Sequence, residues 1–136
     1  MRRLFAFFSL VTLFMVSCKK EETTSDSIIG KWKLIEIYQG YAMGGCFCWN
    51  QVSPANADIL EFYFTGKYKL TKSPLSSSIG CSGNYRLLSD STIAMTYDCQ
   101  ADPNREFTHK YSKSSNEFII DYQGIEGVIR YKYRRN

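Results

Sequence analysis

The feature that most constrains the fold is a regular series of short runs, rich in tyrosine, phenylalanine, isoleucine and threonine, between turn residues. Eight runs occupy the chain from residue 28 onward, at intervals typical of a β-sandwich or β-barrel. They span residues 31–39, 58–64, 67–72, 84–88, 92–98, 105–113, 117–122 and 127–134. No segment among them has a convincing helical pattern. The runs therefore predict an all-β domain.

Apolar side chains alternate along several of these runs, as they do in strands with one buried face. The residues that share a face are Leu60, Phe62 and Phe64; Ile93, Met95 and Tyr97; Phe118, Ile120 and Tyr122; and Ile129, Tyr131 and Tyr133. Short turns, such as Thr65-Gly66, join consecutive runs in the manner of β-hairpins. We therefore expect an eight-stranded antiparallel up-and-down barrel with these faces inside. One connection, over residues 40–57, is long.

The N-terminal residues have the pattern of a removable targeting signal. Two arginines precede an apolar run over residues 4–16, which is too short for a membrane-spanning helix of roughly 20 residues. The following stretch resembles a lipobox, although Met15 stands where that pattern usually has leucine. We therefore expect residues 1–17 to be a lipoprotein signal peptide. Cys18 would then carry the acyl chains, such as palmitate.

The residues after Cys18 predict a tether. Residues 19–27 are charged or hydroxylated, so we expect residues 18–27 to be a lipid anchor and flexible tether and residues 28–136 to be one barrel domain. Several acyl chains bind a membrane firmly, because each buried methylene contributes about 0.8 kcal/mol. Lys19 replaces the aspartate associated with inner-membrane retention in enteric bacteria. This favours the outer membrane, on its periplasmic or surface-exposed face.

Four further cysteines, Cys46, Cys48, Cys81 and Cys99, form an even set, which in an oxidising compartment predicts two disulfides. Of the three possible connectivities we favour bonds from Cys46 and Cys48 to Cys81 and Cys99, because a bond between Cys46 and Cys48 closes a strained ring. Zinc is the alternative, but the spacing lacks the usual Cys-x-x-Cys pairs. We therefore expect no metal and no cofactor.

The segment Gly30-Lys31-Trp32 at the start of the first run, the long first loop and a late arginine resemble the lipocalin and wider calycin pattern. The resemblance covers the whole mature domain and is strongest to the small lipocalin-like lipoproteins of Bacteroidota. It implies that Gly30 turns the chain into the barrel and that Trp32 closes one end under an arginine. Arg130 is the better candidate for that arginine and Arg134 the alternative. The C-terminal helix of full-length lipocalins is missing.

A barrel of eight strands holds one small ligand or is filled by its own side chains. The candidate apolar wall consists of Phe62, Phe64, Met95, Tyr97, Tyr111, Phe118 and Tyr131, with a lid from Phe47 and Trp49. Glu36 and His109 fall on inward-facing positions and are candidates to orient a ligand. The alternatives are a plain aromatic core, satisfied polar groups, or an outward position of either residue beyond a β-bulge.

Two functional hypotheses follow. In the first, the protein is a binding module that holds a small hydrophobic or amphipathic ligand in the barrel at the cell envelope. The long aromatic loop would then control access to the ligand. The second is a protein-interaction or hydrolase-inhibitor lipoprotein that acts through a rigid Cys46–Trp49 loop. The chain has a single histidine and no Ser-His-Asp arrangement, so we expect no enzyme. The chain is expected to be exported and is nearly neutral once the signal is removed, so we expect no nucleic-acid partner.

Overall fold

The computed structural model describes residues 27–40, 47–76, 79–124 and 127–136. A 3₁₀ helix, η4 (Pro54–Asn56), occurs in these ranges, which contain no α-helix. None of the helical structure described is long and apolar enough to cross a membrane. The strands are β1 (Gly30–Gln39), β2 (Cys48–Gln51), β3 (Ile59–Phe62), β4 (Lys67–Thr71), β5 (Cys81–Ser89), β6 (Thr92–Thr96), β7 (Glu106–Lys113), β8 (Glu117–Gly124) and β9 (Gly127–Arg135).

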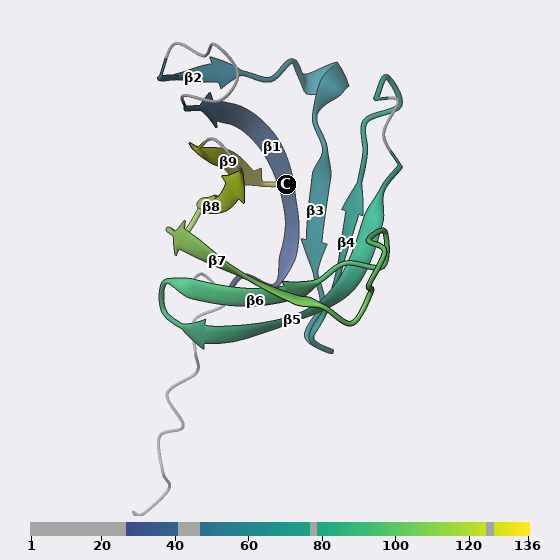
Figure 1. The fold of residues 1–136 in the computed structure, drawn as a ribbon. Coiled ribbons are helices and arrows are strands. Elements are labelled where there is room, and N and C mark those ends of the chain that lie inside the picture. Colours follow the sequence, from purple (N-terminus) through teal and green to yellow (C-terminus); the bar gives the residue numbers. More distant parts are fainter. Residues whose placement is uncertain (1–26, 41–46, 77–78, 125–126) are drawn as a thin grey trace, which may run out of the picture.

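Eight of these strands close a barrel (Figure 1). β1 pairs with β3, each later strand pairs with the next along the chain, and β9 pairs back with β1. All the pairings are antiparallel. The predicted fold class, an all-β up-and-down barrel of eight strands, is therefore confirmed.

The ninth strand, β2, lies within the connection that the sequence predicted only as a long loop. β1 has ten residues whereas β3 has four, so β3 covers only the first part of one edge of β1. β2 pairs with the remainder of that edge, from Glu36 to Gln39. The backbone N–H and C=O groups of β1 that β3 does not reach thus pair with β2, which is not one of the eight strands that close the barrel.

The register of the strands gives the barrel two distinct ends. At the closed end, β1 begins and β9 ends, and Trp32 is 0% exposed with its indole Nε1 donating to the Ile28 carbonyl at 2.7 Å. The other end, called here the open end, carries β2, η4 and the connections from β4 to β5 and from β6 to β7. The described chain starts at the closed end.

The half of the interior next to the closed end is filled by side chains. The Phe118 ring lies 5.5 Å from the Phe62 ring, 5.6 Å from Trp32 and 5.7 Å from Tyr111, measured between centroids. Such aromatic pairs add to the free energy gained from burying their surface. The largest fully buried side chains among the described residues are Trp32, Leu60, Phe62, Ile93, Met95, Phe118 and Ile120. This half is a packed core.

Candidate functional site

The open half of the interior contains a cluster of tyrosines around the single histidine. Tyr97 follows β6, while His109, Tyr122 and Tyr131 come from β7, β8 and β9, at alternate positions that face inward. The hydroxyl of Tyr97 lies 2.7 Å from His109 Nε2. The His109 and Tyr122 rings are 4.7 Å apart, and Tyr122 and Tyr131 meet edge to face at 5.2 Å. Four neighbouring strands thus place four hydrogen-bonding rings together.

Burial keeps this cluster uncharged near neutral pH. It raises the pKa of the Tyr97, Tyr122 and Tyr131 hydroxyls, so that all three keep their protons. Burial also lowers the pKa of the His109 imidazole, and the Asp121 backbone carbonyl opposes this shift in part. The open half therefore offers neutral donors and acceptors on aromatic rings.

His109 has no well-aligned hydrogen bond at Nδ1, although the Asp121 backbone carbonyl lies near enough to act on the imidazole pKa. The residue is 8% exposed, and its Nδ1 is buried with no partner within hydrogen-bond geometry. Buried polar atoms are nearly always paired, because an unpaired one costs about 1–3 kcal/mol. Among the described residues, Nδ1 is therefore a buried polar atom that remains available to a ligand or a water molecule.

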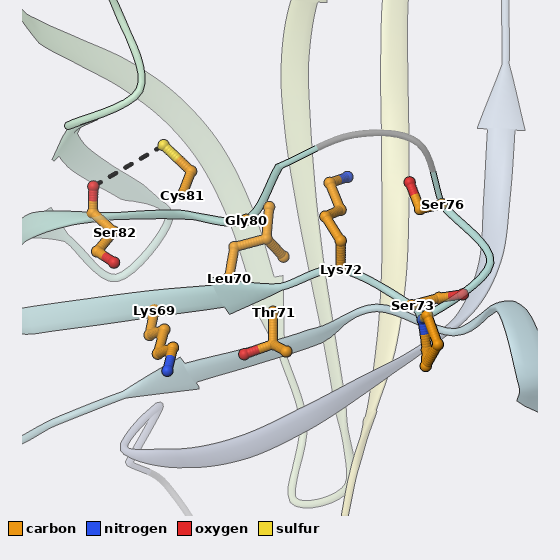
Figure 2. A pocket seen from close by; sticks show the side chains of 10 residues that line it. Lys69, Leu70, Thr71, Lys72, Ser73, Ser76, Gly80, Cys81 and Ser82 are labelled. Carbon is orange, nitrogen blue, oxygen red and sulfur yellow. Dashed lines mark hydrogen bonds between the residues drawn. The ribbon is translucent and has the colours of Figure 1, made fainter.

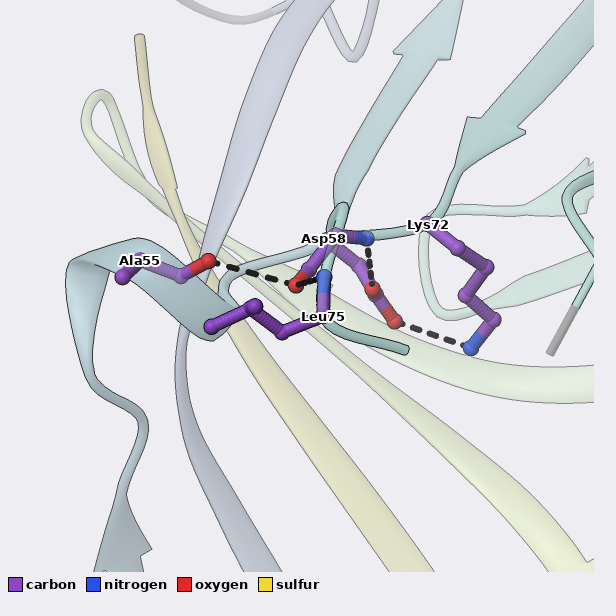
Figure 3. A network of polar contacts seen from close by, with 5 residues as sticks. Ala55, Asp58, Lys72 and Leu75 are labelled. Atoms are coloured by element: carbon purple, nitrogen blue, oxygen red, sulfur yellow. Dashed lines mark hydrogen bonds and ion pairs between the residues drawn. The ribbon is translucent and has the colours of Figure 1, made fainter. Parts of the chain in front are cut away.

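An ion pair stands at the rim of the open end (Figure 3). Lys72 Nζ lies 2.9 Å from Asp58 Oδ2, and the backbone N–H of Ser73 donates to Asp58 Oδ1 at 3.0 Å. The Ser73 hydroxyl donates to the Ala55 carbonyl at 3.2 Å. These contacts fasten the end of β4 to the segment containing η4. Asp58 and Lys72 also act on the pKa of Tyr131, in opposite directions, after the larger effect of burial.

A surface hollow of about 420 Å³ lies beside this ion pair (Figure 2). Leu70 and Cys81 form part of its wall, but hydroxyl and amino groups from neighbouring residues also face it. It is lined by Lys69, Leu70, Thr71, Lys72, Ser73, Pro74, Ser76, Gly80, Cys81 and Ser82. This hollow differs from the apolar chamber expected from the sequence, because it lies at the surface beside β4 and β5, where lysine and hydroxyl side chains share its wall with apolar ones.

The predicted apolar wall divides into three groups. Phe62, Met95, Tyr111 and Phe118 belong to the packed core of the closed half. Phe64 does not face the interior, so that prediction is wrong. β3 ends at Phe62, and Phe64 lies in the following turn with 84% of its surface exposed. Two members of the set, Tyr97 and Tyr131, lie in the open half together with His109, which faces inward as predicted.

Glu36 points outward, contrary to the prediction from alternation. The register between β1 and β9 shifts between Leu34 and Glu36, and a β-bulge of this kind reverses the faces of the residues that follow. Ile37 consequently packs against the core, while Glu36 pairs with Lys132 and Gln51 on the outer face. Lys132, through hydrogen bonding and charge, is the main cause of the lowered pKa of Glu36.

The predicted lid is not a lid over the mouth of the barrel. Trp49 on β2 pairs with Tyr38, and their rings are 5.5 Å apart on the same outer face as Glu36. Lys132 Nζ lies 4.3 Å from the centroid of the Trp49 ring, a favourable cation–π contact. Phe47, next to β2, is 57% exposed with a left-handed backbone φ of 52°. The contacts of Trp49 therefore fasten β2 to the outer wall.

Cys81 and Cys99 are bonded to each other, so the favoured connectivity from both to the Cys46/Cys48 loop is wrong. The turn after β6 explains the pairing, because Asp98 accepts a 2.7 Å hydrogen bond from the backbone of Ser82 and brings Cys99 beside the start of β5. Neither sulfur is a free thiolate, which contradicts the four-thiolate zinc alternative. Cys48 is also disulfide-bonded. Cys46, the signal peptide 1–17 and Cys18 lie outside the described residues.

The arginine at the closed end is Arg135. Its guanidinium carbon lies 4.5 Å from the centroid of the Trp32 ring, and Trp32 is paired with Arg135 across β1 and β9. The predictions of Arg130 or Arg134 are therefore wrong. Arg130 lies on the outer face, over Tyr38 and beside Asp121. Gly30 has a backbone φ of 126° at the entry to β1, a conformation that residues with a side chain rarely adopt. This agrees with the expectation that Gly30 turns the chain into the barrel.

The sequence argument also missed members of the open-half cluster. Tyr122 shares the alternating face of Phe118 and Ile120, so its inward position was readable from the sequence. The ion pair at the rim had no such signal in the sequence. Asp58 lies just before β3 and Lys72 just after β4, and the tertiary fold brings the two side chains together.

No family model matches the chain, and no curated protein matches its sequence. Among solved structures, the chain is similar to one described as an uncharacterized protein from Bacteroides eggerthii DSM 20697. The two share 18% sequence identity with a TM-score of 0.55, over 81% of this chain and 100% of the other. At this identity the likeness shows the barrel fold alone.

Proposed function

We propose that the chain is a lipocalin-like lipoprotein, anchored through lipid on Cys18, that binds a small amphipathic molecule in the open half of its barrel at the outer membrane. The lipobox-like segment before Cys18 supports the anchor. The barrel supports the binding role, because a closed sheet of eight strands presents its interior to a ligand from one end.

The buried, unpartnered Nδ1 of His109 is the observation that carries the binding proposal. It lies in a cluster of tyrosine hydroxyls whose rings supply apolar contact area. A ligand with an aromatic or apolar body and one polar group matches this combination. The filled closed half restricts the ligand to the open half, so we expect a molecule of modest size.

Native mass spectrometry of the full mature protein tests this proposal. We expect an added mass that disappears on denaturation, and a loss of that mass in a variant with both Tyr97→Phe and His109→Phe. Tyr38→Phe is the matched control, because Tyr38 lies on the outer wall, and it should retain the mass. A wild-type protein that carries no molecule after extraction from its native envelope would contradict the proposal.

The second candidate function is protein interaction, such as inhibition of a hydrolase, through the Cys46–Trp49 loop. The exposed ring of Phe47 beside the outer-wall Trp49 favours it, since aromatic residues are typical interface anchors. Inhibition of a cell-wall hydrolase such as lysozyme by the wild-type chain, lost in Phe47→Ser, would support this function. The same variant should leave small-molecule binding unchanged if the first function holds.

A further inference from the structure

Exposed apolar side chains gather at the closed end of the barrel, in three segments. Ile29 precedes β1, Tyr63 and Phe64 belong to the turn from β3 to β4, and Leu87 and Leu88 lie just before the last residue of β5; all five are exposed. The Tyr85 backbone N–H donates to the Gly66 carbonyl at 2.7 Å, which places β5 against that turn. Figure 1 shows the turn and the tip of the β5–β6 hairpin on the lower side of the molecule.

These side chains extend beyond the packed core. β4 begins opposite Asn84, and β5 continues to Ser89, so Leu87 and Leu88 reach past the start of β4. Both faces of β5 are exposed there, since consecutive residues point to opposite sides of a strand. A phenyl ring at the tip of a turn and a Leu-Leu pair form an apolar surface of the kind that marks an interaction site.

The closed end is also basic. The segments that form it, residues 27–33, 61–67, 87–92, 110–117 and 133–136, contain seven basic and three acidic residues. The acidic residues are Glu61, Asp90 and Glu117, and the basic residues are Lys31, Lys33, Lys67, Lys110, Lys113, Arg134 and Arg135. Lys67, Lys110 and Lys113 are exposed, so their charge is available to an anionic membrane surface.

The chain enters the barrel at this same end. Arg135 donates from Nη2 to the Ser27 carbonyl at 2.6 Å, which fixes Ser27 beside the end of β9. Ser27 follows Cys18 by nine positions in the sequence, so covalent geometry limits their separation to roughly 30 Å. With Cys18 lipidated, as proposed above, the tether from the bilayer joins the barrel at the closed end, so this end is the first part of the barrel that a short tether brings to the membrane.

We infer that the closed end is a membrane-contacting surface, in which Phe64, Leu87 and Leu88 enter the interface of an anionic phospholipid bilayer. The surrounding lysines contact the headgroups, and the open end faces away from the membrane. Apolar insertion and electrostatic attraction act together in such surface binding. This inference uses the anchor of the proposed function but not its ligand.

Quenching by brominated lipids tests which end touches the bilayer. The full lipidated protein is reconstituted in vesicles of phosphatidylethanolamine and phosphatidylglycerol with brominated acyl chains, as Phe64→Trp and, for the matched control, Ile79→Trp. Ile79 is 88% exposed and belongs to the β4–β5 connection at the open end. We expect additional quenching over the wild type for Phe64→Trp and none for Ile79→Trp. Equal quenching of the two, or none of either, would overturn the inference.

A second measurement separates this surface from the anchor. Mass analysis of the N-terminal peptide reports directly whether Cys18 is lipidated. To measure membrane binding without the anchor, the full chain with Cys18→Ser is mixed with vesicles of the same lipids without bromine. Sedimentation of this chain with the vesicles should fall several-fold on adding Leu88→Ser and Phe64→Ser, whose exposed positions leave the melting temperature unchanged. An unchanged sedimentation overturns the inference. The Phe64→Trp emission is also recorded without vesicles. A blue shift that grows as the protein concentration rises would show self-association through this surface and would overturn the inference of membrane contact.

Discussion

Arg135 covers the Trp32 ring at the closed end of the barrel, joining the last strand to the first across the seam where the sheet closes. The guanidinium carbon is 4.5 Å from the ring centroid, and the same side chain donates to the carbonyls of Ser27 and Ile29. Trp32 is fully buried beneath it. One side chain therefore holds the chain entry, the barrel end and the C-terminal strand together.

Replacement of Arg135 by alanine should destabilise the fold, since it removes the cation–π contact with Trp32 and the hydrogen bond to Ser27. We expect the free energy of unfolding to fall by about 1–3 kcal/mol. Arg130→Ala is the matched control, because Arg130 is an exposed arginine of the same strand, and should change it by less than about 1 kcal/mol. Urea unfolding measures both. Equal effects of the two variants would show that the contact with Trp32 adds nothing.

The stability of the protein should decrease as the pH falls below about 6.5, because of His109. Burial lowers the pKa of His109 in the folded state, so the unfolded chain binds the proton more readily. Protonation in that pH range therefore stabilises the unfolded chain relative to the folded protein. Urea unfolding between about pH 8 and pH 5 should show this slope. Because the chain has one histidine, His109→Phe should remove the slope while Tyr97→Phe keeps it. A slope that persists in His109→Phe contradicts this assignment.

Gly83 should not tolerate a side chain. An added Cβ would lie 1.9 Å from the Thr96 carbonyl oxygen of the neighbouring strand and 3.1 Å from the Tyr68 ring. Gly83→Ala must move backbone atoms, and overpacking of this kind costs about 1–3 kcal/mol. Ser82→Ala, one residue earlier, should be close to neutral. Thermal unfolding compares the two, and similar melting temperatures would show that β5 and β6 separate easily at this point.

Removal of the Cys81–Cys99 bond should destabilise the barrel without changing its fold. The bond spans 18 residues, and the double variant Cys81→Ala with Cys99→Ala should lose about 2–4 kcal/mol, because the unfolded chain gains conformational freedom. Non-reducing peptide mapping checks the pairing independently. A peptide that joins Cys81 or Cys99 to the Cys46–Cys48 loop would contradict the bond.

The face of a residue was predictable where alternation continues within one unbroken strand, but not for Phe64, because β3 ends at Phe62. Phe118, Ile120 and Tyr122 followed the alternation, and extending the alternation of Tyr131 and Tyr133 by one step would have found Arg135. For Glu36, alternation alone favoured an inward position, and the structure has the outward alternative, because the bulge between Leu34 and Glu36 changes the parity and depends on how β1 pairs with β9. A bulge has no dependable signal in one strand alone.

Local alternation and short turns, which each act over a few residues, were sufficient to predict the all-β class and the order of the eight barrel strands. The closure around Trp32 was implied by the lipocalin resemblance and not by these local patterns. Other features were set by the way the strands pack and pair. The tertiary structure joined Cys81 to Cys99, placed Trp49 on the outer wall and gathered His109, Tyr97, Tyr122 and Tyr131 in the open half. The disulfide and the cluster depend on the register and curvature of neighbouring strands, and the place of Trp49 depends on the closure of β9 against β1, none of which local patterns specify.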